Sequence, residues 1–517
     1  MLNRLYFGFI LIFFFISFSL VAKEGEININ YNGTVRSRTF FLGRDVLLNR
    51  VSPTSPIYSK ESEIDQRNSN AYDLYQSELE ARKTGKPSVL SPHKENLQYQ
   101  DAWLSMNINF IFSQYVDALW GFRVGNIIWG GKPQNTSSPN SPYVLGGGSG
   151  GEMGLGETAG VNLQTNFLYM NFKTPSQHMN TRVGLQLFSS VRGRVLYAQG
   201  TGIKMTKDIN RYHINLIGGW MRARERSFLD RDGNGFSDKN FVNVNVYFLS
   251  ARLNYFHFMK NELYTYYQQD SDPNDPSQET GVLSWHGFYN EFNFKKYSFV
   301  VHGILNQGKV RSLNPVRDET GAAIFDKTDR HRIKGGMLDL EFSYFFDNQT
   351  SLNFITVATS GRPGAETDGV DASYRGNGFR TLYPGFSISN VAIDWTGGYA
   401  IFGTGSLGVP LSGLAEYGTY VTFPLFRLKA TLGYYQLHAL KSPHIENNRY
   451  FNTENYKNTS TYFGQEYNFD LRWMVLGNLY LIFRSGYFVV GDGLKALNDT
   501  LYGSSIREAF LSAEVKF

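Results

Sequence analysis

The sequence predicts an all-β fold, a transmembrane antiparallel β-barrel of about 18 strands that follows a cleaved signal peptide. Three observations lead to this prediction: many segments alternate apolar and polar residues with period two, short and long connections alternate between them, and the chain begins with an apolar stretch. In a barrel wall, one side of each strand contacts lipid and the other faces water. The composition, 16% aromatic and 42% hydrophobic with 52 glycines, suits strands and turns better than membrane helices.

Residues 1–22 predict a secretory signal peptide. Arg4 supplies a positive charge, residues 5–20 form an unbroken apolar run, and Ala22 offers a small residue for cleavage. The alternative is an uncleaved anchor helix, because the apolar run nearly reaches spanning length. Residues 23–517 are then predicted to form a single outer-membrane barrel with long extracellular loops. The chain has no cysteine, which excludes a lipoprotein anchor and a disulfide framework.

The last eleven residues, 507–517, show the alternation most clearly. Ala509, Leu511, Ala513 and Val515 share one side with the terminal Phe517, and mostly polar residues occupy the other side. A half-buried strand that ends a soluble sheet would show the same pattern. The connections along the rest of the chain favour a barrel wall, in which this strand closes the sheet against the first one.

The pattern predicts strands in pairs, each pair joined by a short turn and followed by a longer loop. Short turns are expected at the periplasmic end of such a barrel and long loops outside the cell, and closure with both ends on one side requires an even strand number. The predicted strands are 26–39, 97–112, 118–129, 161–173, 180–189, 195–206, 211–225, 240–256, 261–270, 281–294, 297–309, 332–345, 350–360, 412–424, 427–438, 462–475, 478–490 and 503–517. The polar residues 42–96 and the Gly/Ser/Pro-rich residues 130–160 are predicted to be loops.

Short patterns in these strands resemble the alginate-export family. The last three strands carry the best matches, and three segments upstream are also similar. The matching patterns are GQEYNFDLRW (464–473), LIFRSGYFVVGDG (481–493), REAFLSAEVKF (507–517), VGLQLF (183–188) with RGRVLYAQGTGIKM (192–205), GGMLDLEFSYFF (335–346) and FRTLYPGF (379–386). The resemblance implies an 18-stranded outer-membrane barrel that secretes an anionic polyuronate. It also implies a periplasmic secretion partner and recognition of Phe517 by the barrel-insertion machinery.

A pore selects its solute through the charged side chains that line its lumen. Strand parity places one set of basic and acidic residues inside. The inward residues are Arg36, Arg38, Arg123, Arg182, Lys204, Lys429, Arg472 and Arg484, with the acids Asp339, Glu341, Glu416, Glu466 and Asp470. Arginine suits carboxylate cargo because its planar guanidinium pairs with carboxylates in a bidentate manner and stays charged. The alternative is that these cations and acids pair with one another and only hold the wall in shape. The family resemblance adds Gln186 to this set.

One motif predicts a metal site. Asp230, Asp232, Asn234 and Asp238 occupy positions 1, 3, 5 and 9 of a calcium loop similar to an EF-hand, with Gly235 at the turn. Phe241 stands at the twelfth position, so the bidentate glutamate is missing. The motif predicts a structural Ca²⁺ in an extracellular loop, with a solvated acidic turn as the alternative.

These features favour an outer-membrane channel for an anionic polysaccharide or a similar anionic solute, by export or passive diffusion. The alternatives are a general or substrate-specific uptake porin, and a surface adhesin or receptor with a plugged lumen. No catalytic motif or required cofactor is predicted, so the protein is not expected to be an enzyme. The net charge of +5 is too mild and dispersed to predict nucleic-acid binding.

Overall fold

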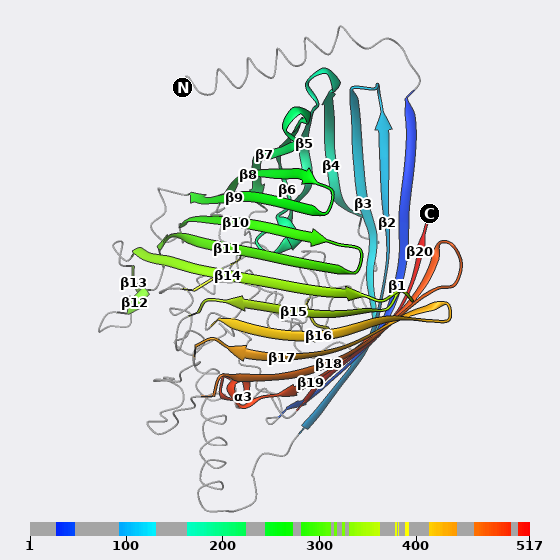
Figure 1. Ribbon diagram of the computed structural model, residues 1–517, viewed down its shortest axis with the longest axis vertical. Helices are drawn as coiled ribbons and strands as arrows, with labels where there is room; N and C mark the ends of the chain where they lie inside the picture. Colours follow the sequence, from blue (N-terminus) through cyan, green and yellow to red (C-terminus); the bar gives the residue numbers. More distant parts are fainter. Residues whose placement is uncertain are drawn as a thin grey trace, which may run out of the picture.

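In a computed structural model, the protein is a closed barrel of 18 antiparallel strands (Figure 1). The structure describes residues 27–46, 93–130, 163–223, 243–271, 281–311, 315–317, 323–325, 330–361, 378–379, 381, 388–391, 413–441, 460–497 and 505–517. The predicted signal peptide and the predicted calcium loop lie outside these residues, and both stay predictions. No helix in the described part is long and apolar enough to cross a membrane.

All 18 predicted strands are present, with ends shifted by a few residues. They are β1 Asn28–Val46, β2 His93–Ile111, β3 Val116–Gly130, β4 Leu163–Thr174, β5 Met179–Ser189, β6 Tyr197–Ile209, β7 Ile214–Ala223, β8 Asn243–Phe256, β9 Met259–Ser271, β10 Gly281–Asn293, β11 Tyr297–Arg311, β14 Arg330–Phe345, β15 Ser351–Thr359, β16 Leu414–Leu425, β17 Leu428–Ala439, β18 Tyr462–Met474, β19 Leu479–Val490 and β20 Ser505–Lys516. Between them lie the small hairpin β12 Pro315–Arg317 and β13 Ala323–Phe325, the helix α3 Asp492–Leu497, and the 3-10 turns η1 Pro175–Gln177, η2 Val191–Gly193 and η3 Asn210–Tyr212.

Two boundaries of the predicted loop 42–96 are wrong. β1 continues to Val46 and β2 begins at His93, because the ladder between them runs without interruption from Asn28 opposite Ile111 to Val46 opposite His93. Polar residues, among them Arg44, Asp45, Lys94 and Glu95, interrupt the apolar alternation in these extensions. Backbone hydrogen bonding to a neighbour decides strand length here, and side-chain polarity does not.

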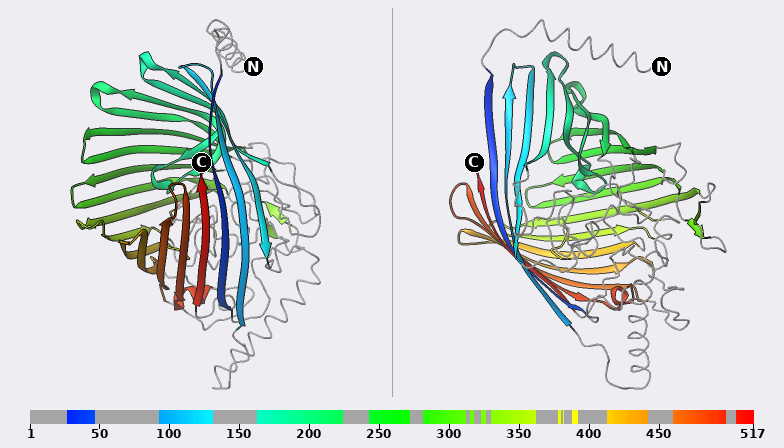
Figure 2. Two further views of the ribbon diagram at one scale, coloured as in Figure 1. Left: turned by 90° about the vertical axis from the view of Figure 1, so that its right-hand side faces the viewer. Right: turned by 180° about the vertical axis from the view of Figure 1, so that it is seen from behind.

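The barrel closes where the two ends of the chain meet. β20 pairs with β1 from Thr34 opposite Lys516 to Arg44 opposite Ile506, as predicted for the terminal strand. Figure 2 shows β20 (red) between β19 (brown) and β1 (blue). At the seam, the Gly33 N–H donates to the Phe517 carbonyl at 2.8 Å, and the Phe517 N–H donates back at 3.1 Å. The terminal residue is therefore part of the ladder that joins the two ends.

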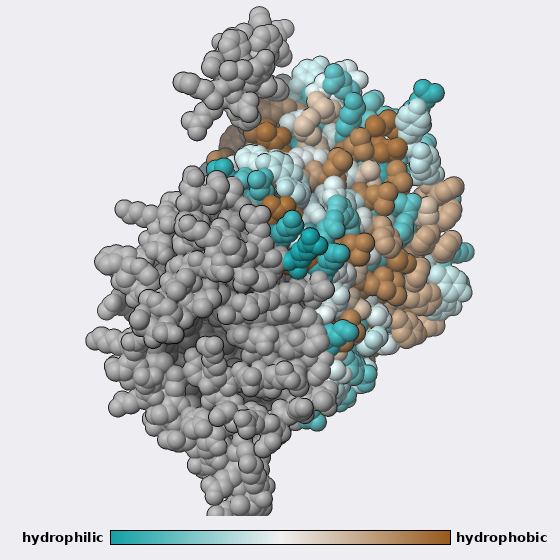
Figure 3. All heavy atoms as spheres, turned by 90° about the vertical axis from the view of Figure 1, so that its left-hand side faces the viewer, coloured by the Kyte–Doolittle hydropathy of each residue, from teal (hydrophilic) through white to brown (hydrophobic). Residues whose placement is uncertain are grey.

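The two faces of the wall differ in chemistry. Large apolar side chains such as Leu305 (67% exposed), Leu249 and Leu511 point outward, and the predicted charged residues alternate with them on the inside. In Figure 3, hydrophobic residues (brown) gather along the coloured wall, with hydrophilic ones (teal) next to the grey atoms and at the outer tips. An apolar outer face that alternates with inward charged residues suits a wall in lipid.

Gly33 provides a test of the seam. A Cβ at this position would lie 2.5 Å from the Phe517 ring and 2.9 Å from the Ser105 carbonyl oxygen. We expect Gly33→Val to destabilise the barrel by about 1–3 kcal/mol, as overpacking typically does, measured as the urea midpoint of unfolding in detergent. Ser37→Val on the same outer face of β1 is the control, and equal stability of both variants would contradict this role of the seam.

Candidate functional site

The lumen is crossed by residues 190–196, which connect β5 to β6 and fold inward. The Ser190 hydroxyl accepts the N–H groups of Val195 and Leu196, each at 3.0 Å, and closes the segment into a tight turn. Gly193 has φ of 65°, a left-handed conformation that glycine adopts without strain. This turn projects Arg192 and Arg194 away from their own strands.

Both arginines reach carboxylates on the far wall. Arg194 Nε donates to Asp339 Oδ2 at 2.8 Å, and Arg192 Nη2 donates to Glu341 Oε2 at 2.6 Å. Six strand pairings separate β6 from β14 on the shorter way round the barrel: β6–β7, β7–β8, β8–β9, β9–β10, β10–β11 and β11–β14. The ion pairs therefore span the lumen and anchor residues 190–196 across it.

The carboxylates are held from behind by side chains of other strands. The Tyr420 hydroxyl donates to Glu341 Oε1 at 2.9 Å, and the His302 ring lies 3.9 Å from Asp339. Tyr264 contacts the other ring nitrogen of His302 at 2.7 Å. Asp339 and His302 are both fully buried. Asp339 and Glu341 were predicted to line the transport path, but both form ion pairs with the protein's own arginines.

A second segment, residues 388–391, lies inside the barrel against β18 and β19. Glu466 Oε1 accepts the N–H groups of Asn390 at 2.6 Å and Val391 at 2.8 Å. The Asn390 side-chain amide donates to Asp470 at 2.8 Å and accepts from Arg484. Part of the connection between β15 and β16 is therefore inside the lumen, held by three residues that were predicted to line a transport path.

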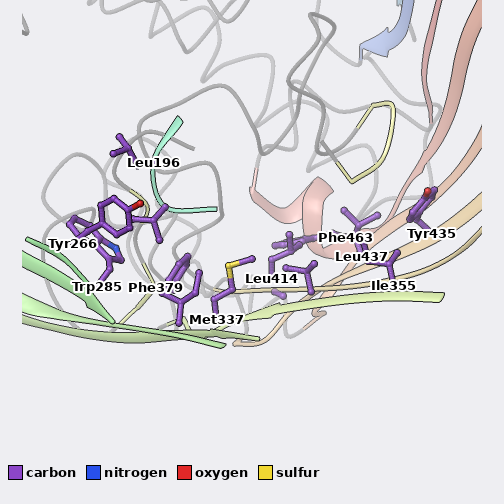
Figure 4. Close-up of a cluster of buried hydrophobic side chains, with 14 of the residues drawn as sticks. Leu196, Tyr266, Trp285, Met337, Ile355, Phe379, Leu414, Tyr435, Leu437 and Phe463 are labelled. Atoms are coloured by element: carbon purple, nitrogen blue, oxygen red, sulfur yellow. The ribbon is translucent and has the colours of Figure 1, made fainter. Parts of the chain in front are cut away.

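A cluster of buried apolar residues lies inside the barrel, around these two segments. Leu196 comes from residues 190–196, Phe379 from the separate stretch 378–379, and Trp285, Met337 and Phe463 from the wall; all five are buried. Figure 4 shows Trp285, Met337, Phe379 and Phe463 along the inner side of the strands, with Leu196 farther toward the interior. Sequence reasoning missed Arg192, Arg194 and this core, because nothing local distinguishes an inward apolar residue under a loop from an outward one facing lipid.

Several predicted cations lie on aromatic rings instead. The guanidinium carbons of Arg36 and Arg123 lie 4.3 Å and 4.7 Å from the centre of the Trp103 ring. Arg182 lies 5.4 Å from the Tyr169 ring and Arg472 lies 4.8 Å from the Tyr480 ring. Lys204 and Lys429 have no ion pair with any described residue, and neither do these four arginines. These six cations are free to attract an anion.

The remaining predicted residues have partners or are inaccessible. Arg38 forms a buried bidentate pair with Asp101, and Arg484 lies 3.5 Å from Asp470. Gln186 donates to the Arg182 and Gly202 carbonyls at 3.3 and 3.4 Å, so its amide serves the wall. Glu416 is fully buried in β16. Each of the two interpretations of the inward charged residues therefore applies to part of the set. Some of these residues pair with one another and hold the structure, and others stay free of ion pairs with described residues.

Two free cations face a polar cavity of about 350 Å³ in the lumen wall formed by β5 to β9. Arg182 and Lys204 line it beside Asp208, together with the ion pair of Arg252 Nε and Glu262 Oε2 at 2.6 Å. Phe188 and Ser189, which directly precede residues 190–196, form another part of its lining. The cavity therefore adjoins the place where the chain enters the lumen.

The fold has counterparts among solved structures. OccK9 (OpdG) of Pseudomonas aeruginosa is similar over 94% of this chain and 98% of its own, with a TM-score of 0.50 and 11% identity. This chain shares its closed β-barrel fold. OccAB1 of Acinetobacter baumannii (TM-score 0.49, 11% identity, 94% and 96% covered) and the outer membrane protein opdK of Pseudomonas aeruginosa (0.47, 9%, 94% and 98%) are further matches. At these identities the likeness concerns the fold alone.

No family model and no curated protein matches this chain. The comparisons do not support the resemblance to the alginate-export family. The patterns that carry it, such as residues 464–473 and 481–493, lie in β18 and β19. Alternating lipid-facing and lumen-facing residues recur in outer-membrane barrels of many kinds, so short strand patterns identify the architecture better than the cargo.

Arg194 tests the ion pairs across the lumen. Arg194→Ala leaves Asp339 buried beside a single remaining cation, and removing one partner of a buried pair typically costs about 3–5 kcal/mol. We expect a matching loss in the free energy of unfolding, measured in urea. The double variant Arg194→Met with Asp339→Leu removes both charges and should recover most of the loss; an equally unstable double variant would contradict the pairing.

Gly486 tests the second inner segment. A Cβ on this residue would lie 2.5 Å from Val391 Cγ2, so Gly486→Val should push residues 388–391 away from β19. We expect a larger single-channel conductance in planar bilayers, because the segment occupies lumen space. Ser485→Val, the neighbouring outward residue of β19, is the control, and an unchanged conductance of Gly486→Val would contradict a role of this segment in narrowing the lumen.

Proposed function

We propose that this barrel is a passive-diffusion channel through which small anionic solutes, carboxylates above all, cross the outer membrane into the cell. The observation that carries the proposal is the division of the lumen cations: Arg36, Arg123, Arg182 and Lys204 lack carboxylate partners among the described residues. A free guanidinium that lies on an aromatic ring keeps its N–H groups available at its edge for a carboxylate.

The charges are distributed unevenly around the wall. Arg36, Arg123, Arg182 and Lys204 come from β1, β3, β5 and β6, whereas Asp339, Glu341, Glu416, Glu466 and Asp470 come from β14, β16 and β18. Arg192 and Arg194 neutralise part of the acidic side. Four of the six free cations therefore gather on the β1–β6 wall, and only Lys429 and Arg472 lie on the acidic side, which supports a path for anions along β1 to β6.

The two inner segments favour a small solute over a polysaccharide. An extended polyuronate chain needs a continuous wide passage, whereas residues 190–196 and 388–391 and their apolar core occupy part of the lumen. The cavity of about 350 Å³ beside Arg182 and Lys204 is within the size range of pockets for small molecules. Uptake of small anions therefore fits this lumen better than export of a polyanion.

A plugged barrel that serves as a surface receptor is the second candidate. The apolar core around Leu196, Phe379 and Phe463 favours it, because such a core excludes water. The two functions differ in one measurement: a receptor with a plugged lumen conducts no ions in a planar bilayer, whereas the proposed channel conducts anions in preference to cations.

Charge reversal at the cavity tests the channel. Each free cation is worth about 1 kcal/mol to an anion in contact with it in water, so Arg182→Glu with Lys204→Glu should lower the anion-to-cation permeability ratio about tenfold or more. The measurement is the reversal potential in a salt gradient. Lys207→Glu, outward on β6, is the control and should leave the ratio unchanged; unchanged selectivity in the double variant would overturn the proposal.

A further inference from the structure

An apolar groove runs along the outer face of the barrel, away from the lumen. Its volume is about 900 Å³, and its lining comes from strands β8 to β15. Leu249, Leu263, Phe288, Leu305 and Leu338 form its walls. Most of the lipid-facing surface is convex, so a hollow of this size on the wall can receive a hydrocarbon chain lengthwise.

Small residues create the hollow. Gly336 and Ala358 face outward on β14 and β15, next to the large side chains of Leu305 and Leu338. A Cβ at Gly336 would have only ordinary contacts, the nearest at 3.5 Å, so no close packing requires glycine there. The polar groups in the groove satisfy each other, since Thr265 Oγ1 and His286 Nδ1 are 3.0 Å apart. In hydrocarbon such internal pairing is needed, and the groove therefore suits acyl chains.

Three exposed cations lie at one end of the groove, on the same outer face. Lys309 on β11 is directly opposite Arg332 on β14, Gln307 is opposite Lys334, and Leu305 is opposite Gly336. Successive residues on one face of a strand are about 7 Å apart, so Lys334 lies one such step beyond Gly336. The structure gives these three side chains no ion pair or hydrogen bond with any described residue. Like charges directly opposite destabilise a strand pair, and a bound anion would remove that repulsion.

The position of these cations identifies the lipid layer they meet. β11 ends and β14 begins at the long-loop end of the barrel, which is the extracellular end in this topology. Outward lysine and arginine are unfavourable in the hydrocarbon layer and become tolerable at the interface. The cluster therefore lies at the head-group level of the outer leaflet, and the groove beside it runs across the neighbouring strands on the side toward the acyl chains.

We infer that the groove and the cluster of Lys309, Arg332 and Lys334 bind a phosphorylated, multiply acylated glycolipid of the outer leaflet. Its phosphate contacts the three cations, and an acyl chain lies along Leu305 and Leu338. A second copy of the chain fits less well, because a two-fold contact through the groove would bring identical cationic clusters near each other. A zwitterionic phospholipid would fill the groove but leave the cations without a net anionic partner.

The test measures lipid retained by the full-length protein after purification in a non-ionic detergent. Native mass spectrometry with added lipopolysaccharide should show about tenfold less bound lipid for the triple variant Lys309→Gln, Arg332→Gln and Lys334→Gln. Gly336→Leu, which fills the groove and leaves all three cations in place, should show a similar loss. The matched control removes three cations at the opposite end of the barrel, Lys207→Gln, Arg211→Gln and Lys295→Gln, and should retain the lipid.

Other outcomes would overturn the inference. Equal retention in all variants would indicate adventitious detergent-resistant lipid only. Equal binding of a zwitterionic phospholipid would mean that the groove acts without the cations, and a dimer that Gly336→Leu dissociates would identify a second copy as the occupant. Ion selectivity should stay unchanged in every variant, because the groove is outside the lumen. This result separates the lipid site from the proposed channel.

Discussion

Closure of the sheet is the constraint on which the rest of this structure depends. In lipid each backbone N–H and C=O needs a partner within the protein, and an open sheet edge would leave a row of them without one. β1 and β20, which are almost the whole chain apart, provide those partners for each other. The Phe517 main chain completes the ladder at Gly33. Once the ring is closed, every strand has one face toward lipid and one toward the lumen, and the chemistry of both faces follows.

Inside the ring, the charged residues fall into two groups. Acids on β14 and β18 bind inner segments: Asp339 and Glu341 hold Arg194 and Arg192, and Glu466 holds the backbone at Asn390. These hydrogen bonds and ion pairs hold the inner segments inside the lumen. The cations on the β1–β6 side are largely left out of this pairing and lie on aromatic rings. A lumen with one occupied and one available set of charges can be both narrowed and selective.

On the outside, the wall is uniform in polarity but not in shape. Glycine and alanine on β14 and β15 leave a hollow between leucines, and three cations lie at one end of it. The hollow and the cations come from neighbouring strands with a fixed register. Both faces of the wall are therefore built from the same alternation of residues.

The sequence by itself determined the barrel, its 18 strands and which charged residues face inward, because period two in the residues matches period two in the pleat and short turns alternate with long loops. It did not determine which of those charges are free. Arg38 and Arg36 are two residues apart and read alike, yet Asp101 pairs with one and Trp103 stacks on the other. Nor did it predict that residues 190–196 cross to β14, since that contact joins residues about 150 positions apart. Strand pattern is local, whereas the partner of a lumen charge depends on which segments the closed ring brings together.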